Sequence, residues 1–240
     1  MLTLAFDTSG LHGSVALLDG PRVIAERTLP TDRRSAQTLA PAIAELLASQ
    51  GLTAQQIHLV ATTIGPGSFT GLRVGITTAK TFAYAAGAEV IGISTLEAIA
   101  HRVQIGQLAP QVARTGLQLE IHAILDAQRK ELFLARFTLT CSTRDESNLL
   151  PLTRLTDDHI ISADDWLASL TSGTIVAGAA LDRLQARLPP EVIIDPHSRQ
   201  PSAAIIGQLA HRDYQSGRRD NLWKLAPLYL RPSYAEEKAK

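Results

Sequence analysis

The chain has 240 residues, of which 45% are hydrophobic, and its 23 basic residues are balanced by 23 acidic ones. This length allows one large domain or two smaller ones, each with its own core. The balanced charge argues against a protein that grips RNA by itself. The single cysteine, Cys141, excludes a disulfide or a cysteine-based zinc site within the chain. No segment approaches the ~18 apolar residues of a membrane span, so we expect a cytoplasmic protein without membrane contact.

The first hundred residues alternate between extended and helical patterns. Three extended segments are predicted over residues 2–7, 14–18 and 23–29, separated by turn residues. They are followed by helices and strands in alternation, predicted over 35–49, 57–64, 68–86, 90–93 and 94–102. This order builds an α/β sheet covered by helices.

The second half repeats the opening pattern. A predicted strand over 121–126 ends in Asp126 and is followed by an extended segment over 131–137, so that Asp7 and Asp126 occupy equivalent places. Later elements are strands over 173–179 and 193–195, a helix over 202–214 and an apolar tail over 225–234. We expect two related lobes, an N-terminal one at 1–103 and a C-terminal one at 104–240, with the last helix and tail packing back on the first.

The densest glycine run is GPGSFTGLRVG at residues 65–75. Its spacing fits neither the P-loop nor the dinucleotide-binding fingerprint. A sharp turn capped by Ser68 and followed by a helix fits better. Each interior glycine costs a helix roughly 1 kcal/mol relative to alanine. The stripe Gly71, Gly75, Thr78 and Phe82 therefore predicts close approach of another backbone, from within the domain or from a partner.

A second turn, Asp7-Thr8-Ser9-Gly10, ends the first strand. A strand-end aspartate followed by small hydroxyl residues is how actin-like and sugar-kinase-like ATPases hold a metal-bound phosphate. The equivalent turn after Asp126 carries only alanine and bulky residues at 127–130, which obstruct a phosphate. We therefore expect Asp7, Thr8 and Ser9 to form a vestigial phosphate turn, with a plain tight hairpin as the alternative.

No histidine pair or nucleophile motif is present, so the sequence predicts neither a metal site nor catalytic residues. A basic segment, over 211–224, is predicted to be a solvated helix end. A contact for an acidic partner or RNA is the alternative reading.

Taken together, the chain resembles the bacterial TsaB (YeaZ) family. Four segments carry the resemblance: LAFDTSGLHGSVALL, IGPGSFTGLRVGITTAKTFAYA, ILDAQRKELFLARF and APLYLRPSYA. They extend from residue 4 to residue 235. One departure is Ser35, ahead of Gln37 and Pro41, where family members often have a histidine.

The resemblance implies a two-lobed actin-like ATPase (ASKHA) fold, each lobe a mixed sheet flanked by helices. It implies a non-catalytic scaffold subunit that forms a heterodimer with its paralogue TsaD, is joined by TsaE, and forms homodimers when alone. The assembly transfers threonylcarbamoyl to N6 of adenosine 37 in ANN-decoding tRNAs, which this subunit reaches only indirectly. No cofactor of its own is implied, with ATP or ADP at a complex interface.

We expect the partner interface to lie on two helices of the first lobe. Its predicted residues are Leu39, Ile43, Leu47, Gly71, Gly75, Thr78 and Phe82. Two other functions stay open. One is an ATP-dependent phosphotransferase of the same fold, which rests on Asp7. The other is a metallopeptidase, against which the absent histidine pair argues.

Overall fold

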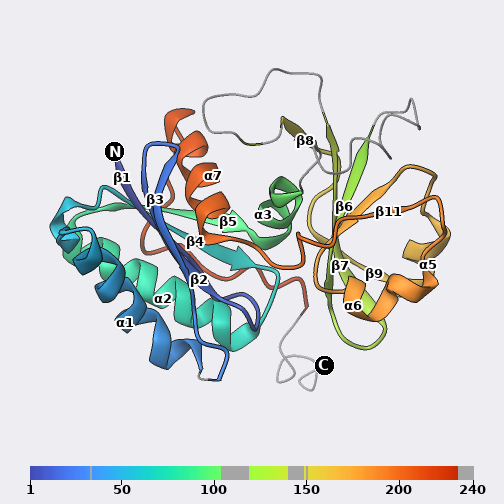
Figure 1. Ribbon diagram of the computed structural model, residues 1–240, viewed down its shortest axis with the longest axis horizontal. Coiled ribbons are helices and arrows are strands. Elements are labelled where there is room, and N and C mark those ends of the chain that lie inside the picture. Colours follow the sequence, from blue (N-terminus) through green and yellow to red (C-terminus); the bar gives the residue numbers. More distant parts are fainter. Residues whose placement is uncertain (33, 104–118, 140–148, 150, 232–240) are drawn as a thin grey trace.

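The computed structural model describes residues 1–32, 34–103, 119–139, 149 and 151–231. Two mixed β-sheets lie side by side, each with its own helices (Figure 1). We call the first sheet with its helices the first lobe, and the second sheet with its helices the second lobe. Cys141, the segment 104–118 and the end of the predicted tail lie outside the described residues.

The first sheet has the strand order β3-β2-β1-β4-β5. Its strands are β1 (Leu2–Asp7), β2 (Ser14–Asp19), β3 (Arg22–Thr28), β4 (Leu59–Gly65) and β5 (Glu89–Ser94). The first three form an antiparallel meander, and β1, β4 and β5 are parallel. Both faces of the sheet are buried, as the almost continuous burial of β1 and β2 requires.

Helices cover both faces of this sheet. Helices α1 (Ser35–Ser49) and α2 (Phe69–Ala86) pack on one face, where Leu4 and Phe6 point. Helix α7 (Ala203–Gln215), from the C-terminal end of the chain, packs on the other, where Ala5 points. This is the two-residue alternation of a strand. The short helix η1 (Ala54–Gln56) precedes β4.

The second sheet has the order β11-β10-β6-β7-β8, with β9 also paired to β7. Its strands are β6 (Glu120–Asp126), β7 (Glu131–Leu139), β8 (Leu152–Arg154), β9 (His159–Ser162), β10 (Ile175–Ala177) and β11 (Ile193–Ile194). Helix α3 (Thr95–Arg102) packs on one face. The short helices α5 (Ala163–Ala168), α6 (Leu181–Leu184) and η2 (Gln185–Arg187) follow β9 and β10 on the other side.

The two sheets share one core topology. In the first, β1 pairs antiparallel with β2 and parallel with β4; in the second, β6 pairs antiparallel with β7 and parallel with β10. The predicted mixed sheet in each lobe is therefore confirmed. No helix among the described residues is both long and apolar enough to cross a bilayer.

Candidate functional site

The turn after β1 buries its aspartate. The Asp7 side chain is fully shielded from solvent, and its Oδ1 accepts hydrogen bonds from the Ser9 amide (2.9 Å) and the Thr63 hydroxyl (2.7 Å). Its Oδ2 has no hydrogen-bond partner in the described part of the chain. Burial raises the pKa of Asp7 above its ordinary value, more than these hydrogen bonds lower it. This carboxyl therefore faces inward, and its burial disfavours the charged form that would bind the metal ion of a metal–phosphate group.

The glycine-rich segment seals this turn. The Ser68 amide donates to the Ser9 carbonyl (2.7 Å), and the Thr8 hydroxyl donates to the Gly71 carbonyl (2.7 Å). A Cβ atom on Gly71 would overlap the Thr8 carbonyl oxygen, and one on Gly75 would lie 2.5 Å from the Thr8 hydroxyl. The predicted close backbone approach is therefore an internal one, between α2 and the first turn. The predicted cap is confirmed, because the Ser68 hydroxyl accepts from the Gly71 amide.

The turn after β6 has the same local geometry in a different setting. The Oδ1 of Asp126 accepts from the Gln128 amide (2.9 Å), as that of Asp7 does from Ser9, which confirms the predicted equivalence. Asp126 is exposed, however, and pairs with Arg183 at 3.3 Å. After Ala127, the three residues Gln128 to Lys130 all have left-handed backbones with φ of 52–64°, a region that residues other than glycine seldom occupy.

The C-terminal tail connects the two turns. The Leu228 amide donates to the Ile64 carbonyl (2.7 Å) beside the first turn. Three residues later, Arg231 donates to the Ala127 carbonyl (2.7 Å) and pairs with Glu131 at the second turn. Tail residues thus bridge the lobes where an actin-like ATPase would hold its nucleotide.

A pocket of about 950 Å³ lies beside the tail, between the lobes. Phe69, Leu72, Phe133, Leu228 and Tyr229 give it an apolar wall. Asp7 does not line it. Among the described residues, no three histidine, cysteine, aspartate or glutamate side chains lie close enough to hold a metal ion. The cleft can admit an apolar group but offers no acid pair for phosphoryl transfer.

A second pocket, of about 670 Å³, lies between the first turn and the N-terminal ends of α1 and α2. Ser35, where family members often have a histidine, lines it together with Arg34 and Thr70. Among the described residues, no side chain caps the N-terminus of α1.

The predicted interface leucines and isoleucine are not available to a partner. Leu39, Ile43 and Leu47 are only 1%, 4% and 6% exposed and pack in the core between α1, α2 and the first sheet. The prediction that a partner contacts these three side chains is therefore not supported, because an amphipathic helix turns its apolar stripe to its own core. Thr78 and Phe82 are half-buried.

The exposed positions of these helices include many small side chains. They are Ala36, Ala40, Ala44 and Ala48 on α1, and Thr70, Thr77, Thr81 and Ala85 on α2. We call this set the α1–α2 face. The signal in the sequence is four alanines at four-residue spacing, which place one column of small side chains on a helix.

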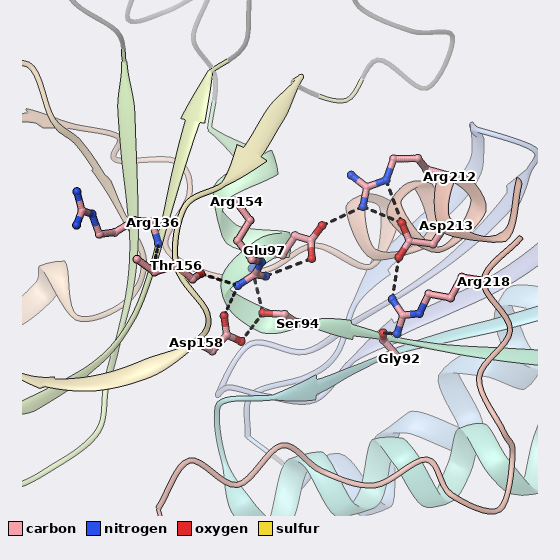
Figure 2. Close-up of polar contacts among 10 residues, drawn as sticks. All are labelled: Gly92, Ser94, Glu97, Arg136, Arg154, Thr156, Asp158, Arg212, Asp213 and Arg218. Carbon is pink, nitrogen blue, oxygen red and sulfur yellow. Dashed lines mark hydrogen bonds and ion pairs between the residues drawn. The ribbon is translucent and has the colours of Figure 1, made fainter. Parts of the chain in front are cut away.

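Charged side chains join the lobes on the far side of the first sheet. Figure 2 shows Glu97 of α3 between Arg154 of the second sheet (3.3 Å) and Arg212 of α7 (2.9 Å). Burial would raise the pKa of Glu97, but Arg212 and its other cationic neighbours hold it below the ordinary value. Nearby, burial lowers the pKa of His101 to about 4, so this histidine is neutral. The cluster is structural: it fixes α3 between the sheets.

Comparisons with known proteins place this geometry in a family. The model of the family described as "TsaD: tRNA N6-adenosine threonylcarbamoyltransferase" matches residues 22–150, more than half of the chain. The TsaB protein of Haemophilus influenzae is 27% identical over 95% of this chain and 92% of its own length. The chain belongs to the TsaB (YeaZ) family.

Other TsaB proteins match shorter stretches. The Escherichia coli protein is 32% identical over 62% of this chain and 58% of its own length, and the Bacillus subtilis protein is 35% identical over 42% and 44%. All three are named for tRNA threonylcarbamoyladenosine biosynthesis.

Two solved structures from Pseudomonas aeruginosa have the same fold. One is described as YeaZ and the other as similar to peptidase YeaZ. They cover 95% and 96% of this chain and 99% of their own, with TM-scores of 0.71 and 0.73 at 24% and 25% identity. The predicted two-lobed actin-like ATPase fold is confirmed.

Proposed function

We propose that this TsaB-family chain is a non-catalytic partner subunit of a TsaD-containing complex. The complex transfers threonylcarbamoyl to N6 of adenosine 37 in tRNAs that read ANN codons. The family and the names of its relatives support the pathway. One observation carries the partner role: Asp7, the aspartate that would hold a metal-bound phosphate, is buried beneath the glycine-rich segment of its own chain.

An ATP-dependent phosphotransferase is not favoured by this geometry. Such an enzyme needs a charged, open aspartate and free amides or hydroxyls facing the anion. Here the Ser9 amide donates to Asp7 and the Thr8 hydroxyl donates to Gly71. The second turn is filled by large side chains and tied to Arg231. ATP or ADP, where the assembly holds one, is placed by this proposal at a subunit interface.

We assign the docking of TsaD to the α1–α2 face. Small exposed side chains let the backbone of a partner helix approach closely, which suits helix-to-helix packing. A second copy of this chain takes the same face when TsaD is absent. In this proposal TsaE joins the assembly in the cytoplasm.

A bulky charge at the centre of the face tests this assignment. Ala44→Arg should lower the affinity for TsaD at least tenfold in pull-down or calorimetric titration. It should also reduce threonylcarbamoyl transfer in a reconstituted mixture. Ala168→Arg, an exposed alanine at the end of α5 in the second lobe, is the matched control. Equal TsaD binding by both variants, at unchanged melting temperature, would remove TsaD from this face. Failure of the unmodified chain to bind TsaD would overturn the partner role itself.

A further inference from the structure

Two large aromatic side chains stand exposed at the C-terminal end of α2. Tyr84 is 69% exposed and Trp223 is 70% exposed, and their rings lie 5.6 Å apart at an interplanar angle of 60°. Trp223 lies two residues before the tail, and the carbonyl groups of Trp223 and Leu225 accept hydrogen bonds from Lys80. Two neighbouring aromatic rings that are exposed to solvent are unusual on a protein surface that binds no partner.

A second aromatic pair lies at the other end of the same helix. Phe69 stacks on Tyr229 with ring centroids 5.1 Å apart, and the Arg73 guanidinium lies 3.8 Å from the Phe69 centroid. Because Tyr229 and Arg73 both contact Phe69, this pair is already stacked. The two pairs are fifteen residues apart on α2, or about 22 Å. The free aromatic faces are therefore those of Tyr84 and Trp223.

Positive charge accompanies these rings. Arg73, Lys80 and Lys224 make no ion pair with any described residue, whereas Arg212 and Arg218 are both paired with aspartate. We call these three cations and the two aromatic pairs the α2–tail surface. Its charge is complementary to a polyanion, although the charge of the whole chain is balanced.

We propose that the α2–tail surface contacts single-stranded RNA, as a loop of the tRNA on which the proposed complex acts. The inference rests on the proposed function and adds to it a direct contact with substrate. Unstacked bases bind on exposed aromatic faces, and lysine and arginine side chains neutralise the phosphates between them. Trp223 offers the stacking face, while Lys80 and Lys224 flank it.

This contact departs from the expectation that the tRNA is reached only indirectly. That expectation rested on net charge, which averages over the whole surface. A contact of two aromatic pairs and three cations is too small to hold tRNA alone. Its role is to add affinity to a complex in which the partner supplies the remaining contacts, so the test uses the complex.

The two tryptophans allow a direct test. This chain, labelled with 5-fluorotryptophan, is mixed with unlabelled TsaD and then titrated with an unmodified ANN-decoding tRNA transcript. The fluorine resonance of Trp223, assigned with Trp223→Phe, should shift or broaden when tRNA is added. The resonance of Trp166, which is fully buried in the second lobe, is the internal control. A Trp223 resonance that changes with TsaD alone and not with tRNA would assign the surface to a protein partner and overturn the inference.

Affinity measurements test the same contact quantitatively. Trp223→Ala should weaken tRNA binding by the complex roughly 5- to 100-fold. Lys224→Gln should reduce the slope of log affinity against log salt by about one, whereas Lys130→Gln, an exposed lysine on the second turn, should leave it unchanged. Equal slopes for the two lysine variants would contradict the proposal. If the complex forms and modifies tRNA but Trp223→Ala binds normally, this inference falls while the proposed function stands.

Discussion

The two hairpin turns start from one geometry and end in different environments. In each, an aspartate at the end of a strand accepts a hydrogen bond from the amide two residues later. Asp7 is then buried beneath the start of α2, whereas Asp126 stays exposed and is followed by bulky residues in left-handed conformations. The backbone of a phosphate turn can thus be retained in both lobes while phosphate access is closed by two different routes.

The C-terminal tail lies near both turns. It contacts β4 beside the first turn through Leu228, and it contacts the second turn through Arg231. A nucleotide bound in an actin-like cleft would touch both turns. Here the tail contacts the second turn and the end of β4 beside the first turn. The lobes are joined again at Glu97 on the other side of the first sheet (Figure 2).

The largest effect is expected where the first turn is sealed. Gly71→Ala should lower the free energy of unfolding by about 3 kcal/mol, because the added methyl group overlaps the Thr8 carbonyl within a packed core. Thr77→Ala, at an exposed position of the same helix, should change it by less than about 0.5 kcal/mol. Chemical denaturation measures both. Similar losses of stability for the two variants would mean that the close packing of Gly71 on Thr8 contributes little to the free energy of unfolding.

A smaller effect is expected at the second turn. Arg231→Met removes the hydrogen bond to Ala127 and the ion pair with Glu131, both half-buried. It should cost about 1 kcal/mol and speed hydrogen exchange of the amides at 127–131. Arg183→Met removes only the exposed pair with Asp126 and should cost less than about 0.5 kcal/mol. If Arg183→Met opened the turn more than Arg231→Met, the tail would not be what holds it.

The smallest expected effect is a pH dependence at the first turn. Because burial raises the pKa of Asp7 in the folded state, the folded protein retains this proton as the unfolded chain loses it near pH 4. The contribution of Asp7 to stability is therefore present below the unfolded pKa and is lost as the pH rises through the folded pKa. Asp7→Asn has no such loss, so its stability relative to the unmodified chain should rise with pH above about 4. Thermal melts across pH 3.5 to 8 measure this trend, and a relative stability that falls with pH would contradict a raised pKa of the buried carboxyl.

The sequence predicts the repeated hairpin because alternation and a terminal aspartate are local signals. It also predicts the Ser68 cap, whose partner is three residues away. The sequence does not predict which segment packs against Gly71. Thr8 lies far from it in the chain, and a glycine in a helix indicates close packing without indicating the partner. The predicted interface on the leucines of α1 fails for a related reason. The sequence pattern of a helical apolar stripe is the same whether the stripe packs on its own sheet or on a partner. Trp223 and Tyr84 meet only through the path of the tail.

The central claim is that the turn after β1 is closed to phosphate. Isothermal titration of the isolated chain with Mg-ATP tests this claim most directly. The buried Asp7 and the occupied Ser9 amide predict no binding heat at micromolar to submillimolar ATP. Micromolar binding that disappears in Asp7→Ala, a variant shown to be folded by circular dichroism, would contradict the account.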